Sequence, residues 1–397
     1  MITDTLTAFD ARTKPAGPST TPASVNEPVT SEPTGPIRCA VIGSQPTADN
    51  GWLRLSLEEY TREGIYNPRS TVSRAEIEPG LDELRRRSLQ LQADAGLDIV
   101  SEGELFRTGI NTGIEGVKRS YIVYIAQFIE GIRRTSENKA DPHQPAFTID
   151  APMTAIDTSV ICDDWIRSQQ LTNTPVKVNL PGPITFALRV NNSHYASQEQ
   201  CARDYAYLLG SQLSALEDAG CLWAQIDDPH LAWEFEECPY GVDLINEAIA
   251  QTRGDLRIVV HMCQGNSYAF SGQSSTPKER AYYQRIAPLL ANSKAHAVAV
   301  EKPNVPSLPE FGLSEFGDKI IFLGLIDVAA EAVEPASQIA NDIILALKEV
   351  PVDKLIITPD CGIKHYPESL ALEKLQTMRA AVDGVNVEIQ KIISNNY

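Results

Sequence analysis

Eight short runs of apolar and β-branched residues recur along this chain of 397 residues, and longer segments of helical periodicity separate them. This alternation is typical of parallel strands joined by crossover helices. We expect strands at residues 38–44, 98–102, 176–180, 223–227, 257–261, 296–300, 319–323 and 354–358. Eight strands are the number that closes a (β/α)8 barrel, so we predict an α/β fold with a single TIM barrel.

An open doubly wound sheet is the alternative fold. It is disfavoured because no glycine-rich phosphate-binding fingerprint follows the first run. We expect helices at residues 81–95, 198–219, 242–252, 335–348 and 367–392. The stretch 105–175 is too long for one strand-to-helix connection, so we predict an insertion after the second strand, with a helix at 121–132 and a hairpin near 147–162.

The first 36 residues differ in composition from the rest of the chain. They are rich in Thr, Pro, Ser and Ala and show no apolar periodicity. Such a segment buries too little apolar surface to offset the entropy of ordering. We therefore predict a disordered tail at 1–36 and a catalytic (β/α)8 barrel at 37–397.

Charge and cysteine usage restrict the partners and the compartment. The chain has 52 acidic and 34 basic residues, a formal net charge of −18, which repels phosphate backbones and anionic membrane surfaces. We expect no nucleic acid and no membrane partner. The seven cysteines are odd in number and widely spread, unlike a secreted disulfide framework, and no apolar run reaches the length of a membrane span. A cytoplasmic location is predicted.

Chemically active residues gather where the predicted strands end, which is the end of a barrel that carries the active site. His261 and Cys263 are two positions apart at such an end, so both side chains point to the same side of the strand. Zinc prefers imidazole and thiolate, and accepts carboxylate. Glu301 and Cys361 end two other strands at the same mouth, which gives four residues of the types that hold zinc.

Each of these residues also has an ordinary structural explanation. A His-x-Cys pair is common, and cysteine is among the most frequently buried residue types. Cys361 is equally explained as a small buried residue before a turn, and Glu301 as a surface partner of Lys302. Taken singly, none of the four residues establishes a metal site.

A set of seven segments resembles the cobalamin-independent methionine synthase family. The segments are Ile42-Gly43-Ser44, Glu102-Gly103-Glu104, Leu180-Pro181-Gly182-Pro183-Ile184-Thr185, Gln225-Ile226-Asp227-Asp228-Pro229, His261-Met262-Cys263, Val300-Glu301 and Pro359-Asp360-Cys361-Gly362-Ile363-Lys364. They follow the family's order and cover the chain from about residue 38 to 390. The resemblance implies a barrel of the methionine synthase and uroporphyrinogen decarboxylase type.

The resemblance also implies an activity and a site. The activity is zinc-dependent methyl transfer to the thiol of homocysteine, which gives methionine. The implied zinc ligands are His261, Cys263, Glu301 and Cys361. Glu104 and Asp227 match carboxylates that meet the substrate ammonium and are the implied catalytic residues, and Ser44 matches the group that receives the substrate carboxylate.

Three departures bear on the methyl donor. The long, folate-dependent enzymes of this family carry a second, N-terminal barrel, whereas this sequence is similar to the short core forms. Where those enzymes have a proton-donating His after an Asp, this chain has Val328 after Asp327, and residues 186–190 contain no Trp that would stack on a folate. We therefore expect a donor other than folate. A corrinoid or a corrinoid protein is one candidate donor, and a homodimer is a candidate assembly.

Two other functions fit the same ligand set. One is zinc-dependent alkylation of a different thiol, as in the barrels that open epoxides with coenzyme M. The other is a non-catalytic zinc-binding barrel that acts through a partner. The complete ligand set argues against the second, because a site that is no longer used has no physical need for four converging ligands.

Overall fold

The computed structural model describes residues 37–46, 74–105, 121–134, 147–234, 238–263, 281–301 and 312–395, so the predicted tail at 1–36 lies outside the described residues. The main sheet has eight strands in the order β1-β11-β10-β9-β8-β7-β5-β2. Their bounds are β1 Arg38–Cys39, β2 Val100–Ser101, β5 Val176–Pro181, β7 Trp223–Asp227, β8 Arg257–His261, β9 Ala297–Glu301, β10 Ile320–Ile326 and β11 Leu355–Pro359. Each strand overlaps one of the eight predicted runs, although β5, β9, β10 and β11 extend one to three residues beyond the predicted ends, and all neighbouring pairs are parallel.

The sheet closes between its first and last strands. Ala40 and Ile99, which adjoin β1 and β2, form a parallel bridge. The amides of Asp98 and Ile99 donate to the carbonyl of Cys39 at 2.9 and 3.3 Å. This closure confirms the predicted barrel, and the alternative of an open doubly wound sheet is wrong.

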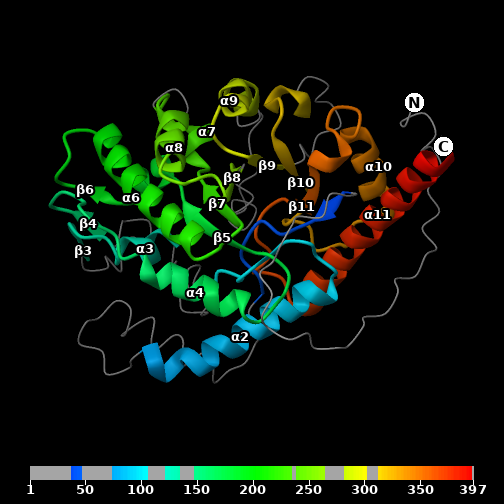
Figure 1. Ribbon diagram of the computed structural model, residues 1–397, viewed down its shortest axis with the longest axis horizontal. Coiled ribbons are helices and arrows are strands. Elements are labelled where there is room, and N and C mark those ends of the chain that lie inside the picture. Colours follow the sequence, from blue (N-terminus) through cyan, green and yellow to red (C-terminus); the bar gives the residue numbers. More distant parts are fainter. Residues whose placement is uncertain are drawn as a thin grey trace.

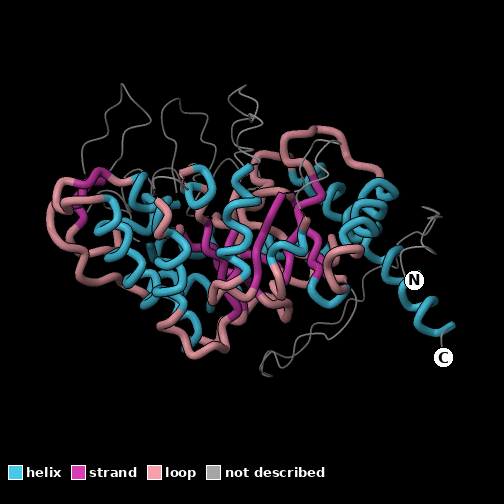
Figure 2. Tube along the Cα trace, turned by 90° about the horizontal axis from the view of Figure 1, so that it is seen from above, coloured by secondary structure: helices cyan, strands magenta, loops and turns pink. Residues whose placement is uncertain are grey.

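Helices surround the strands on the outside of the barrel (Figure 1), and the view turned by 90° shows the strands enclosed between them (Figure 2). Five were predicted: α2 Arg74–Asp94, α6 Gln198–Asp218, α8 Gly241–Ile249, α10 Ala336–Ala346 and α11 Glu368–Asn395. The structure adds α4 Ser159–Gln169, α5 Pro183–Arg189, α7 His230–Trp233 and α9 Ala281–Ala291. Within the described ranges, no helix combines the length and the apolar character that a bilayer span requires.

The insertion after β2 differs from the prediction. Helix α3 is shorter than expected, Tyr121–Ala126, and is followed by β3 Ile132–Arg134. Strand β3 pairs antiparallel with β4 Phe147–Ile149, which pairs in parallel with β6 Asn191–Asn192. The hairpin predicted at 147–162 is therefore wrong, because the partner of β4 precedes it and α4 occupies the expected second strand. Ile161, Trp165 and Ser168 form one buried face of α4 at helical spacing.

The alternation of side chains along the strands separates two layers of the core. Val298 and Val300 of β9 point outward into the main cluster beneath the helices, whereas Ala297 and Ala299 join a second cluster inside the barrel. The other members of that inner cluster are Ala40, Ile42, Ile99, Trp223, Val259, Phe322 and Ile356. By the same parity, Asp227, His261 and Glu301 lie on the inner surface at the C-terminal ends of their strands.

Candidate metal and substrate site

Three candidate metal ligands converge at the C-terminal mouth of the barrel. The ligand atoms of His261, Cys263 and Cys361 all lie within 4.8 Å of one another. The two sulfur atoms are 3.8 Å apart, although 98 positions separate the cysteines in sequence. His261 ends β8, and Cys361 lies two residues after the end of β11. The barrel thus joins residues from two non-adjacent strands in one cluster.

The chemistry of this cluster fits a zinc ion. His261 is only 4% exposed, and its Nε2 atom is buried without a hydrogen-bond partner in the described part of the chain. Leaving a buried polar atom unsatisfied is unfavourable, whereas a metal ion would accept the nitrogen lone pair. A set of two sulfur ligands and one imidazole binds zinc in preference to harder cations.

Glu301 ends β9 and is also buried, with 6% of its surface exposed. Its parity places it on the inner surface, at the same end of the barrel as the cluster. It is not part of the group of His261, Cys263 and Cys361, whose ligand atoms all lie within 4.8 Å of one another. Its role as the fourth ligand remains a prediction.

Asp227 holds the imidazole of His261 in one orientation. Its Oδ1 atom lies 2.9 Å from His261 Nδ1 and also accepts from Gln225 Nε2 at 2.6 Å. A carboxylate at Nδ1 favours the tautomer with the proton on that nitrogen, which leaves the Nε2 lone pair available to a metal ion. The register of β7 and β8 pairs Asp227 directly with His261. Sequence reasoning assigned Asp227 to the substrate and missed this second contact.

Glu104 lies next to this pair in a restrained backbone conformation. Its φ angle is 53°, in the left-handed region, and it follows Gly103 with a φ of 86°. Its Oε1 accepts from Asn179 Nδ2 at 2.7 Å. Burial raises the pKa of the Glu104 carboxyl to about 7, and the negative charge of Asp227 acts in the same direction. Two carboxylates that repel each other in a buried site are suited to binding a cation between them.

The loop after β1 makes two close contacts, one between Gly43 and Glu104 and one between Ser44 and Gly362. A Cβ atom at Gly43 would lie 2.1 Å from Glu104 Oε1, so only glycine allows this approach. A Cβ atom at Gly362 would lie 2.1 Å from Ser44 Oγ. The Ser44 carbonyl also accepts from the amide of Ile363 at 2.8 Å. Ser44 is therefore adjacent to the residue that follows the candidate ligand Cys361.

Three polar residues beneath the carboxylates were not predicted as part of the site. Lys177, Asn179 and Gln225 are each at most 2% exposed and face the barrel interior. Their signal in the sequence is that polar residues take alternate positions in otherwise apolar strands, at 177 and 179 in β5 and at 225 and 227 in β7. That spacing places them on the same face as Asp227.

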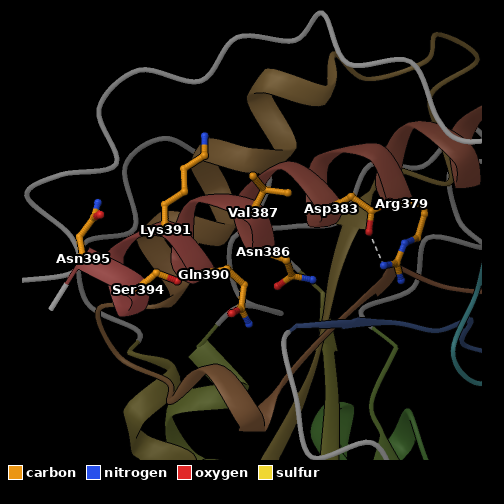
Figure 3. Close-up of a pocket in the computed structure, with 8 residues that line it drawn as sticks. All are labelled: Arg379, Asp383, Asn386, Val387, Gln390, Lys391, Ser394 and Asn395. Carbon is orange, nitrogen blue, oxygen red and sulfur yellow. Dashed lines mark hydrogen bonds and ion pairs between the residues drawn. The ribbon is translucent and has the colours of Figure 1, made fainter. Parts of the chain in front are cut away.

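A hollow on the surface of the barrel is unrelated to this site. It runs along α11 and is lined by residues that include Arg379, Asp383 and Asn386 (Figure 3). Asn386 Nδ2 donates to the carbonyl of Ile37 at 2.9 Å, and Arg379 donates to Asp98 Oδ2 at 2.9 Å. Ile37 and Asp98 precede β1 and β2, so this hollow lies at the N-terminal end of the strands, opposite the mouth.

Comparison with known protein families identifies the family to which the chain belongs. Residues 39–383 match the family described as cobalamin-independent synthase, catalytic domain. The chain belongs to this family. The match covers the barrel from β1 into α11 and includes every residue of the candidate site.

Individual relatives support the assignment. The methionine synthase of Saccharolobus solfataricus is 24% identical over 367 residues, which cover 90% of this chain and 96% of that protein. The methionine synthase of Saccharolobus islandicus is 28% identical over 223 residues, or 56% of this chain and 61% of that protein.

Solved structures agree with the architecture. A B12-independent methionine synthase from a Shewanella species, in complex with selenomethionine, is 25% identical, with a TM-score of 0.72, and the match covers 90% of this chain and 100% of that one. A methyltransferase from Methanosarcina mazei shares the fold at 13% identity and a TM-score of 0.51, with 89% of this chain and 95% of that one covered.

Proposed function

We propose that this protein is a zinc-dependent thiol methyltransferase that methylates homocysteine to methionine. The observation that carries the proposal is the position of Asp227, which contacts His261 of the His261, Cys263 and Cys361 cluster and whose negative charge raises the pKa of Glu104. The metal cluster would bind the thiol of a small molecule, and the two neighbouring carboxylates would bind the ammonium group of the same molecule. The relatives described as methionine synthases support the same substrate.

The zinc would be held by His261, Cys263 and Cys361, with Glu301 as the fourth ligand. When bound, it would lower the pKa of a substrate thiol so that the nucleophilic thiolate is present near neutral pH. The chain's own contribution is orientation: Asp227 fixes the imidazole, and the strand ends fix the two sulfurs. The site therefore needs no separate general base for the thiol.

Glu104 and Asp227 would bind the substrate ammonium, and Ser44 with its neighbouring backbone would bind the substrate carboxylate. Glu104 is 7% exposed and Ser44 is 7% exposed, so solvent screens these interactions weakly. A thiol without an amino group would leave the buried carboxylate of Glu104 and the partly buried carboxylate of Asp227 without a cation between them. Selectivity for an amino-acid thiol follows from that penalty.

The methyl donor is inferred to be other than folate. A folate amine is a poor leaving group unless an acid protonates it, and such help is typically worth about 100- to 10,000-fold. Val328 supplies no proton, and its carbonyl lies 2.7 Å from His365 Nε2. Phe186, in the segment without Trp, is fully buried and stacks on Tyr205 with ring centroids 3.7 Å apart. A methylated corrinoid, whose leaving group departs without a proton, fits these residues better.

The proposal is tested by product formation. Zinc-loaded protein is incubated with homocysteine and either methylcobalamin or polyglutamylated methyltetrahydrofolate, and methionine is quantified. We expect methionine with the corrinoid and much less with the folate. Turnover with folate alone would contradict the donor, and no methionine with any donor, while another thiol is alkylated by an epoxide, would contradict the acceptor and the reaction.

A further inference from the structure

A buried lysine lies inside the barrel, beneath the candidate site. Lys177 of β5 is fully buried, and its Nζ donates to the Ile42 carbonyl at 2.6 Å and to Asn179 Oδ1 at 2.8 Å. It makes a third, short hydrogen bond to Gln225 Oε1. An ammonium group has three donors and no acceptor, so these three oxygens match its hydrogen-bonding capacity.

The lysine determines how the two amides are turned. Because an ammonium accepts no hydrogen bond, Asn179 and Gln225 must both direct their oxygen atoms toward Lys177. Their NH2 groups then face away from it. Asn179 Nδ2 donates to Glu104 Oε1 at 2.7 Å, and Gln225 Nε2 donates to Asp227 Oδ1 at 2.6 Å.

Two chains of hydrogen bonds therefore start at one ammonium group. The first runs from Lys177 through Asn179 to Glu104. The second runs from Lys177 through Gln225 and Asp227 to His261 Nδ1. The first ends at a proposed ammonium-binding carboxylate, and the second passes through the other such carboxylate to a candidate zinc ligand.

We propose that Lys177 is a positioning residue that orients Glu104, Asp227 and, through Asp227, His261 by fixing the amides of Asn179 and Gln225. This inference rests on the proposed function, because it assigns the two chains to the amino-acid pocket and the metal cluster. Without the ammonium, both amide oxygens lose their donor. The Asn179 amide keeps a second hydrogen bond, from Nδ2 to the Ile42 carbonyl at 2.8 Å, so the larger effect is expected at Gln225. If the Gln225 amide turns by 180°, its carbonyl oxygen faces the Asp227 carboxylate, which would move or lose its partner.

The experiment compares variants that interrupt the chains at different points. Lys177→Met removes the ammonium at similar length, Asn179→Leu interrupts the branch to Glu104, and Gln225→Leu interrupts the branch to His261. Lys374→Met is the matched control, since Lys374 is also fully buried and pairs with Glu334 at 3.1 Å in a separate cluster. Zinc affinity is measured by chelator competition, and calorimetry on zinc-loaded protein compares homocysteine with 4-sulfanylbutanoate, which lacks the amino group.

We expect Lys177→Met to lower both zinc affinity and the preference for homocysteine, each by about tenfold or more. Asn179→Leu is expected to reduce the preference and leave zinc affinity unchanged. Gln225→Leu, which acts through Asp227, is expected to reduce both the preference for homocysteine and the zinc affinity. Lys374→Met is expected to lower stability and leave both readouts at the wild-type value, which separates positioning from the loss of a buried lysine.

The inference is overturned if folded Lys177→Met keeps both wild-type values, or if Lys374→Met changes them equally. If Lys177→Met does not fold, Asn179→Leu and Gln225→Leu decide, and wild-type behaviour in both overturns it. A wild-type protein that binds both thiols equally would contradict the proposed function. In that case the zinc affinities of Gln225→Leu and Lys177→Met still test the branch to His261.

Discussion

Asp227 and His261 are direct partners in the register of β7 and β8, and their side chains meet through a contact of 2.9 Å between Oδ1 and Nδ1. Asp227 therefore belongs to both parts of the proposed site. It orients the candidate ligand His261, and its charge raises the pKa of Glu104 in addition to the larger effect of burial. Glu104 accepts from Asn179 Nδ2 at 2.7 Å, whereas Asp227 contacts the imidazole of His261, so the two carboxylates are expected to respond differently to mutation.

Asp227→Ala is expected to weaken zinc binding by about 10- to 100-fold, because a ligand histidine loses the partner that fixes its tautomer. Glu104→Ala is expected to leave zinc affinity unchanged and to weaken homocysteine binding by about 2–5 kcal/mol, as when one member of a buried charge pair is truncated. Metal analysis and calorimetry on the two variants check both values. Equal zinc loss in the two variants would contradict the separation of roles.

The pH dependence of homocysteine binding follows from the carboxyl of Glu104. Burial and the charge of Asp227 raise its pKa to about 7, so in the free protein it is largely neutral below that pH and ionised above it. Because only the ionised form attracts an ammonium, affinity is expected to rise as pH increases through about 7. Calorimetry across this range measures the profile.

Glu104→Gln is the control for that profile. It cannot ionise, so the rise in affinity near neutral pH is expected to disappear while the shape of the pocket is largely kept. The amino-free thiol 4-sulfanylbutanoate corrects for the ionisation of the thiol itself. The same midpoint in Glu104→Gln as in the wild type would assign the titration to another group.

The close approach of Gly43 to Glu104 predicts a steric effect. Ala at position 43 would place a methyl carbon 2.1 Å from Glu104 Oε1 and 2.4 Å from Asn179 Nδ2, so these side chains must shift. Gly43→Ala is expected to raise the KM for homocysteine by about tenfold or more, since a shift of this size misplaces a buried charged partner. Steady-state kinetics and zinc content measure the effect, and an unchanged KM would show that Glu104 does not contact the substrate.

Much of the fold follows from local patterns in the sequence. The runs ending at Asp227, His261 and Glu301 are strands of the expected parity, because apolar residues alternate with the residues that line the barrel interior. Side-chain parity also predicted that His261 and Cys263 face the same way. The convergence of Cys361 with them was expected once these segments were assigned to one barrel mouth.

Other features depend on contacts between distant segments, which local patterns do not encode. Strand β4 pairs with residues 132–134, which precede it, and not with the segment that follows. Helix α4 was missed, although Asp164 on its buried face forms an ion pair with Arg85 of α2 at 2.9 Å. Lys177 is a charged residue inside β5, and its proposed role depends on oxygen atoms of Ile42 and Gln225, which only the closed barrel brings next to that strand.

The most direct test of the account is X-ray absorption spectroscopy at the zinc edge, with the metal content of the same samples measured by elemental analysis. We predict about one zinc per chain, bound by the sulfurs of Cys263 and Cys361, with a third sulfur ligand when homocysteine is added. Cys361→Ser is predicted to remove one sulfur and most of the metal. A folded, active protein without zinc, or a sulfur count that does not change with homocysteine, would contradict the central claim.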